Sequence, residues 1–269
     1  MVMSQYLRKG KTPMISVVIP TYNEEKDIGD LLESLTKQKF KNFEVIIVDN
    51  YSNDRTIEIV SRFKGRLNMR IYKIKSNVSK ARNFGAEKSR GKIIVFLDAD
   101  NIVKEDYLFN IYKSFEPDAV CSAYYGWKKT IFNKLHKEGI SDIPFAIKRD
   151  KFLKVKFDES LSAFEDYDFA KRLDELGYVK VANRKCLVFH KNPDKIYTLF
   201  KQQKKWGEEY YRYLKYHNEK TPPFLLPFLF FLIFIKKLAF AYGYLSAGIR
   251  DIINLRRNSK YAKKTSFDN

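Results

Sequence analysis

The stretch that decides the fold is Ile93-Ile94-Val95-Phe96-Leu97-Asp98-Ala99-Asp100. It begins with five apolar residues in a row, a pattern typical of a strand buried on both faces of a mostly parallel α/β sheet. Such sheets bind their ligands at the carboxyl ends of the strands. Asp98 and Asp100 lie two apart, so we expect them on one side of an extended chain, where they could hold Mg²⁺ or Mn²⁺ beside a diphosphate. An acidic turn capping the next helix is the alternative.

The chain before this stretch alternates between apolar strands and amphipathic helices. Strands are predicted at residues 14–20, 43–48 and 69–74, and helices around residues 28–35, 57–63 and 79–88. This rhythm predicts right-handed βαβ units and a doubly wound nucleotide-binding sheet. The sequence has neither GxGxxG after its first strand nor a Walker-type loop, which argues against a dinucleotide-dependent dehydrogenase or a P-loop NTPase. The negative charge of a bound ligand must then be balanced by a metal ion and by basic side chains such as Lys80 and Arg82.

Composition leaves several classes of partner open. The 269 residues carry a formal charge of +19 and are 16% aromatic. This charge could favour binding to nucleic acid or to an anionic membrane, or it could keep the protein soluble. No recognised nucleic-acid module is visible, so we expect no nucleic-acid partner. Residues 1–13 lack the apolar core of a signal peptide, which places this part of the chain on the cytoplasmic side. Cys121 and Cys186 occur in no CxxC spacing and are predicted to be buried, reduced thiols.

Further motifs stand in order along the chain. They are VVIPTYNEE at 17–25, EVIIVDNYSNDRT at 44–56, VSKARNFGA at 78–86, FLDADN at 96–101, FDESL at 157–161 and FEDYDFAKRLDELGY at 164–178. Together they resemble the family 2 glycosyltransferases of the GT-A fold, over roughly residues 15–206. The resemblance implies a mostly parallel sheet flanked by helices. It also implies inverting transfer of a sugar from a UDP- or GDP-sugar, with Mn²⁺ or Mg²⁺ as cofactor.

The resemblance implies a donor site made by the first four motifs. Its donor-binding residues would be Pro20, Thr21, Tyr22, Glu24, Asp49, Lys80, Arg82 and Asp98. Asp49 would hydrogen-bond the edge of the base, although turn and capping chemistry is the alternative for Asp49 and Tyr22. Members of the family often show an acidic-glycine-serine sequence where this chain has Asp49-Asn50-Tyr51-Ser52. That departure leaves the identity of the base open.

The same resemblance assigns the residues that would bind the metal and the acceptor. Asp98 and Asp100 would hold the metal, and His190 would complete its ligands or be only a polar surface group. The second acidic pair, Glu165-Asp166, stands before a helix predicted from residue 167 to 176. Asp166 would be the general base that deprotonates the acceptor hydroxyl, and Glu165 would bind the acceptor. Acids at a helix start also stabilise its dipole, which is the alternative for this pair.

The segment QQKKW at residues 202–206 resembles part of the QxxRW signature of the family's chain-building synthases. Lysine stands where those enzymes have arginine, so the planar fork of arginine is lost. Trp206 would either stack on an acceptor sugar or pack against the core.

The chain changes character after residue 216, so we predict a catalytic domain over residues 1–216 and a helical segment over 217–269. Residues 224–235 are almost entirely apolar but too few to cross a bilayer as a helix. The following apolar positions recur at helical spacing among arginines, as in a basic amphipathic helix that lies in a membrane interface. We therefore expect a membrane surface and a lipid-linked glycan acceptor as partners. A spanning helix and a dimer interface are the alternatives.

These observations predict a metal-dependent glycosyltransferase that is associated with a membrane. A processive polysaccharide synthase is the alternative enzyme, but the chain lacks the several long spans of an export channel. A non-catalytic basic protein that binds nucleic acid or glycan is the alternative outside enzymes. The sequence leaves the sugar, the base, the acceptor and the oligomeric state open.

Overall fold

The computed structural model describes residues 12–115, 120–125, 140–161, 164–178, 180–190 and 196–216, with residues 242, 245 and 246. The chain divides into two compact units, Met1–Asn192 and Pro193–Asn269. The first contains the sheet, and the second contains α7 (Ile196–Tyr216). Within the described ranges, no helix combines the length and the apolar character that crossing a bilayer requires. The apolar run at residues 224–235 lies outside the described residues, so membrane attachment stays a prediction.

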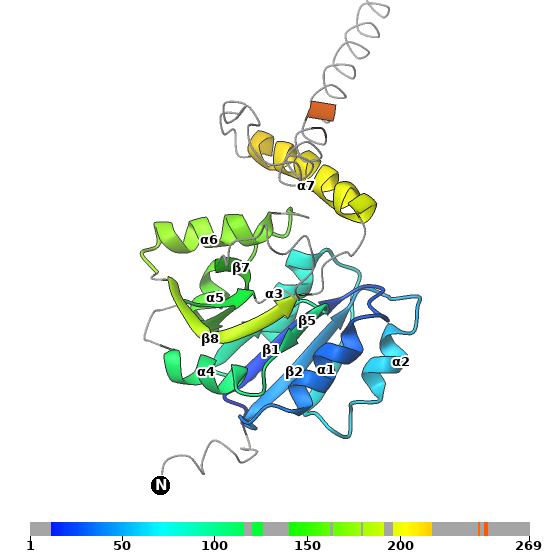
Figure 1. The fold of residues 1–269 in the computed structure, drawn as a ribbon. Helices are drawn as coiled ribbons and strands as arrows, with labels where there is room; N and C mark the ends of the chain where they lie inside the picture. The colour runs from blue at the N-terminus through cyan, green and yellow to red at the C-terminus, as the bar shows by residue number, and fades with distance from the viewer. Residues whose placement is uncertain are drawn as a thin grey trace, which may run out of the picture. The chain divides into compact units, whose positions relative to one another are not determined.

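The first unit is built on one eight-stranded sheet (Figure 1). Its strands are β1 (Ile15–Thr21), β2 (Phe43–Asp49), β3 (Met69–Lys73), β4 (Ile93–Phe96), β5 (Asn101–Val103), β6 (Val120–Tyr125), β7 (Ile140–Lys148) and β8 (Lys180–His190). They are ordered β3-β2-β1-β4-β7-β6-β8-β5. The first four run parallel, and the predicted α/β architecture is confirmed there. Beyond β4 the sheet is mixed, because β7 pairs antiparallel with β4 and with β6, and β5 pairs antiparallel with β8.

Helices cover both faces of the sheet. They are α1 (Ile28–Thr36), α2 (Thr56–Ser61), α3 (Val78–Lys88), α4 (Tyr107–Ser114), α5 (Arg149–Val155) and α6 (Glu165–Glu175). Successive side chains of a strand point to opposite faces, so Val17 of β1 packs with residues of α1, α2 and α4, and Val18 with residues of α3, α5 and α6. Figure 1 shows α1 and α2 against one face of the parallel half. Strand β4 is buried on both sides, as its uninterrupted apolar run predicts.

Two predicted boundaries beside the site are wrong. Strand β4 ends at Phe96, and Asp98 to Asp100 form a turn rather than extended chain. The turn is closed by Asn101, whose backbone nitrogen donates to the carbonyl oxygen of Asp98 at 3.1 Å and whose side-chain oxygen accepts from the nitrogen of Asp98 at 3.0 Å. Helix α6 begins at Glu165, so Glu165 and Asp166 lie inside its first turn instead of before it.

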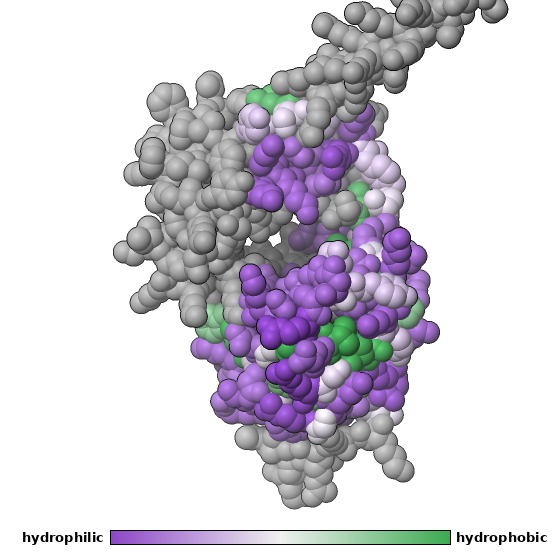
Figure 2. Space-filling view, turned by 90° about the vertical axis from the view of Figure 1, so that its right-hand side faces the viewer, coloured by the Kyte–Doolittle hydropathy of each residue, from purple (hydrophilic) through white to green (hydrophobic). Residues whose placement is uncertain are grey.

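The described surface is mostly hydrophilic. On the face shown in Figure 2, hydrophilic side chains predominate and the hydrophobic ones form small patches among them. Cys186 is a free, buried thiol, as predicted. The side chain of Cys121 lies outside the described residues.

Gly91 permits the close approach of β1 and the turn that leads into β4. A Cβ at this position would lie 2.6 Å from the backbone nitrogen of Ser16 and 2.7 Å from the carbonyl carbon of Ile15. Because backbone would have to move, we expect Gly91→Ala to lower the free energy of unfolding by about 1–3 kcal/mol in urea denaturation. Gly65→Ala is the matched control, since nothing lies within 4 Å of a Cβ there. Equal stabilities of the two variants would contradict this packing.

Candidate active site

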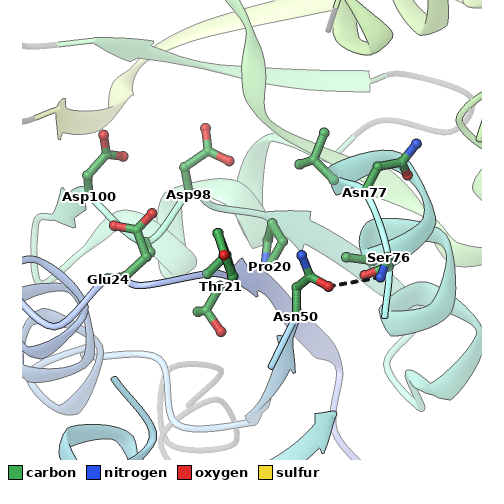
Figure 3. Close-up of a pocket in the computed structure, with 12 residues that line it drawn as sticks. Pro20, Thr21, Glu24, Asn50, Ser76, Asn77, Asp98 and Asp100 are labelled. Atoms are coloured by element: carbon green, nitrogen blue, oxygen red, sulfur yellow. Dashed lines mark hydrogen bonds between the residues drawn. The ribbon is translucent and has the colours of Figure 1, made fainter. Parts of the chain in front are cut away.

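A pocket of about 370 Å³ lies where the parallel strands β1, β2 and β4 end (Figure 3). It is lined by Pro20, Thr21, Tyr22, Glu24, Asn50, Ser76, Asn77, Val78, Ala81, Asp98, Ala99 and Asp100. The structure thus brings together six of the residues predicted from the sequence, namely Pro20, Thr21, Tyr22, Glu24, Asp98 and Asp100. The position agrees with the general rule for ligand sites of parallel α/β sheets.

Two amide side chains of this pocket, Asn50 and Asn77, were not predicted from the sequence. Asn50 follows the last residue of β2, and its side-chain oxygen accepts a hydrogen bond from the backbone nitrogen of Ser76 at 3.0 Å. Asn77 is the N-cap of α3, and its side-chain oxygen accepts from the nitrogen of Lys80 at 2.9 Å. Their positions, directly after a strand and directly before a helix, were the signals that could have identified them.

The loops that follow β1 and β2 are tied together by hydrogen bonds. The backbone nitrogen of Asn50 donates to the carbonyl oxygen of Thr21 at 2.9 Å. The nitrogen of Glu24 donates to the hydroxyl of Thr56 at 2.7 Å, and that of Asn23 to the hydroxyl of Ser52 at 3.0 Å. Glu24 is therefore held at the edge of the pocket by two elements rather than by one loop.

Asp49 lies beneath the pocket and not on its surface. The residue is fully buried, and its carboxylate accepts hydrogen bonds from the hydroxyl of Thr21 at 3.2 Å and from the backbone nitrogen of Ser52 at 3.0 Å. In this geometry the carboxylate fixes both loops. A contact between Asp49 and the base of the donor stays a prediction.

Three carboxylates gather at one end of the pocket. Figure 3 shows Glu24 close to Asp98 and Asp100. Burial, followed by the charges of Asp100, Asp27, Asp98 and Asp54, raises the pKa of Glu24 from 4.5 to about 7. Such a cluster fits a divalent cation, because Mg²⁺ and Mn²⁺ prefer carboxylate oxygens and would offset the mutual repulsion. In the described part of the chain, no three His, Cys, Asp or Glu side chains already have the arrangement of a metal site.

Arg82 stands behind this cluster, with its side chain 4% exposed. Its Nη1 donates to Oε1 of Glu165 at 2.6 Å and its Nη2 to Oδ1 of Asp98 at 2.7 Å. Burial by itself would lower the pKa of Arg82, but Asp98 and Glu165 outweigh it and raise the pKa, so the guanidinium stays charged. The predicted donor-contacting arginine is thus a bridge between two carboxylates, and it is not among the residues that line the pocket.

Helix α3 also holds the loop that precedes α6. The hydroxyl of Ser79 donates to the carbonyl oxygen of Leu161 at 2.9 Å. The side chain of Asn83 donates to the carbonyl oxygen of Phe157 at 2.9 Å and accepts from its nitrogen at 2.9 Å. Two motifs that are about 80 residues apart in the sequence are thereby joined, and the first turn of α6 follows directly.

The remaining predicted residues are placed as follows. Asp166 is half-buried in the first turn of α6, where its Oδ1 accepts from the nitrogen of Tyr167 at 2.8 Å. Lys80 is exposed and does not line the pocket. His190 ends β8, and its backbone pairs in register with Asn101, the neighbour of Asp100. The side chains of His190 and Trp206 lie outside the described residues.

Because the pKa of Glu24 is raised, we expect this residue to make the stability of the fold depend on pH. A carboxyl with a folded pKa above its unfolded value stabilises the fold below the unfolded pKa and loses that contribution as pH rises to the folded pKa. For Glu24 this interval runs from 4.5 to about 7. In chelator, the gain in melting temperature of Glu24→Gln over the unaltered protein should therefore grow from pH 5 to pH 8. A difference that does not change with pH would contradict the acidic cluster.

Comparison with known proteins places the chain among glycosyltransferases. Residues 16–170 match the model of glycosyl transferase family 2. The poly(ribitol-phosphate) beta-N-acetylglucosaminyltransferase TarS of Staphylococcus aureus is 38% identical over 98 residues, which are 35% of this chain and 17% of that protein. An uncharacterized glycosyltransferase of Methanocaldococcus jannaschii is 29% identical over 253 residues, or 84% of this chain and 87% of that protein.

Solved structures share the fold. The mannosyltransferase PcManGT from Pyrobaculum calidifontis, in complex with GDP-Man and Mn²⁺, matches with a TM-score of 0.61 and 19% identity over 98% of this chain and 85% of its own. TarS 1–349 in complex with UDP-GlcNAc matches with a TM-score of 0.55 and 21% identity over 72% of this chain and 66% of that one. The chain spans less than two thirds of the full TarS protein. By the match over residues 16–170 and the motifs within it, the chain belongs to glycosyl transferase family 2.

Proposed function

We propose that this protein transfers a sugar from a nucleotide-sugar donor to a glycan acceptor, with a divalent cation as cofactor. The observation that carries the proposal is the convergence of Glu24, Asp98 and Asp100 in one pocket at the carboxyl ends of parallel strands. The complexes of TarS with UDP-GlcNAc and of PcManGT with GDP-Man and Mn²⁺ support this donor class.

Asp98 and Asp100 are the proposed metal-holding residues, with His190 as a third. When bound, the cation supplies positive charge that neutralises a diphosphate and stabilises the departing nucleotide. Arg82 takes Oδ1 of Asp98 and leaves Oδ2 for a ligand. The half-buried Glu24 experiences the charges of Asp98 and Asp100 and is a further candidate, a role that was not predicted for it from the sequence.

Asp166 is the proposed general base. It would accept the proton of an acceptor hydroxyl while that oxygen attacks the anomeric carbon on the side opposite the nucleotide, which inverts the configuration. Glu165 precedes it in the same helical turn and is fixed by Arg82 at 2.6 Å. The ion pair therefore anchors the turn that carries Asp166 to the floor of the donor pocket.

We also propose that the acceptor is lipid-linked and that residues 217–269 attach the protein to a membrane, with the catalytic unit on its cytoplasmic side. The support is the sequence alone, in which an apolar run at residues 224–235 is followed by a basic amphipathic pattern. Such helices lie in the membrane interface.

A donor screen tests the reaction class. Calorimetry and product analysis with UDP- and GDP-sugars in Mn²⁺ should identify at least one donor that binds and reacts. Asp100→Ala should abolish metal-dependent donor binding while the far-UV spectrum and melting curve stay those of a folded protein, because Asp100 is a pocket residue outside the hydrophobic core. Full activity of Asp100→Ala in chelator would refute the metal site.

Asp166→Asn separates binding from chemistry, since asparagine keeps the shape and removes the base. Transfer should fall by roughly 10²-fold or more while donor affinity changes little. If Asp166 only stabilised the dipole at the start of α6, the asparagine variant would lose about 0.3–1 kcal/mol of stability and keep its turnover. Near-normal turnover would remove Asp166 from the mechanism.

A further inference from the structure

The loop after β2 contains a tyrosine in a costly backbone conformation. Tyr51 has a φ of 56°, in the left-handed region that glycine adopts freely and that costs other residues on the order of 1 kcal/mol or more. Asn23, in the loop after β1, has a φ of 57°, but asparagine tolerates this region better than tyrosine does. Strain of this kind is often stored at functional sites.

The neighbours of Tyr51 fix it in this conformation. On one side, Asn50 is held by its backbone bond to Thr21 and by the bond from Ser76 to its side chain. On the other side, Ser52 is held by the buried carboxylate of Asp49. The segment therefore has two anchored ends, and the strained residue between them cannot relax without breaking hydrogen bonds at the pocket.

The ring of Tyr51 remains exposed although its backbone is fixed. The residue is 60% exposed, and Tyr22, which lines the pocket, is 55% exposed. Strands β1 and β2 pair with Thr21 opposite Asp49, so Tyr22 is the first residue after β1 and Tyr51 is the second residue after the neighbouring β2. Tyr22 lines the pocket and Tyr51 follows Asn50, which also lines it, so the two exposed rings offer apolar surface beside the pocket that a flat ligand could cover.

The pocket itself has two chemically different ends. Figure 3 shows Glu24 and Asp100 on one side and Asn50 and Asn77 on the other. The acidic end suits a metal and a diphosphate. The amide end, whose Asn50 precedes Tyr51 in the chain, offers donors and acceptors but no charge, and this is the chemistry that a nucleobase needs.

We propose that Tyr51 packs against the nucleobase of the donor and is a specificity-determining residue of the amide end. The proposal rests on the proposed function, because it names the part of the nucleotide sugar that this loop recognises. In this proposal, contact between the ring and the base offsets the backbone strain that glycine would avoid.

Calorimetric titrations with UDP, GDP and inorganic pyrophosphate, each with Mn²⁺, test the proposal on the full chain. For the nucleotide that the unaltered protein binds, Tyr51→Gly should weaken affinity about fivefold or more, as expected when one aromatic contact to a base is lost. Tyr51→Phe should restore the affinity, since it keeps the ring. Pyrophosphate should bind equally to all three proteins, because it lacks a base. The melting temperature of Tyr51→Gly should not fall, since glycine relieves the left-handed backbone.

Lys156→Gly is the matched control, because Lys156 also has a positive φ, of 48°, but lies outside the pocket. It should leave nucleotide affinity unchanged. Equal nucleotide binding by Tyr51→Gly and the unaltered protein would overturn the role of Tyr51 while leaving the proposed function intact. A parallel loss of pyrophosphate affinity would also overturn it, because the loop would then act through the metal end. Failure of the unaltered protein to bind either nucleotide would overturn the proposed function and this inference with it.

Discussion

The site depends on the buried guanidinium of Arg82, which lies between Asp98 and Glu165. A buried charge is tolerated only when it is paired, and removing one partner of such a pair typically costs about 3–5 kcal/mol. Here one cation satisfies two carboxylates from distant parts of the chain, the turn after β4 and the first turn of α6. The fork of arginine makes this possible, because its two terminal nitrogens diverge by a fixed geometry that lysine lacks.

The same ion pairs make the acids of the pocket unequal. Asp98 has a cation behind it, whereas Glu24 meets the charges of Asp100 and Asp98 in a partly desolvated position and has its pKa raised to about 7. A ligand that approaches from the pocket side therefore meets an excess of negative charge at one end. In the proposed function, a nucleotide diphosphate bound at this end would need a cation to offset the negative charge, whereas the amide end carries no charge.

The sequence predicted the parts of this molecule that local patterns encode. The strand at Ile93–Phe96 was found because an uninterrupted apolar run identifies a strand buried on two faces, and Asp98 and Asp100 followed from its end. The pocket residues Pro20, Thr21, Tyr22 and Glu24 were implied only by the family resemblance. The sequence did not predict the ion pair between Arg82 and Glu165, because the two residues are 83 positions apart and no periodicity links them. The turn at Asp98 was predicted only as the alternative to an extended chain, and the hydrogen bonds of Asn101 decide in favour of the turn. The assignments on His190 and Trp206 concern side chains outside the described residues.

Helix α3 connects the donor pocket to the helix that carries the proposed base. Its depth is set by Gly85, since a Cβ there would clash with Val18 of β1. Close packing at Gly85 carries Arg82 inward to Asp98, while Asn83 holds the backbone of Phe157. The distance between the donor and the proposed base is therefore fixed by a rigid helix packed on the sheet, not by the loops that line the pocket. Sites supported by packed elements keep their geometry better than sites built on loops alone. Tyr51 lies on the loop after β2, so its proposed contact with the base is separate from the placement of Asp166 by α3 and α6.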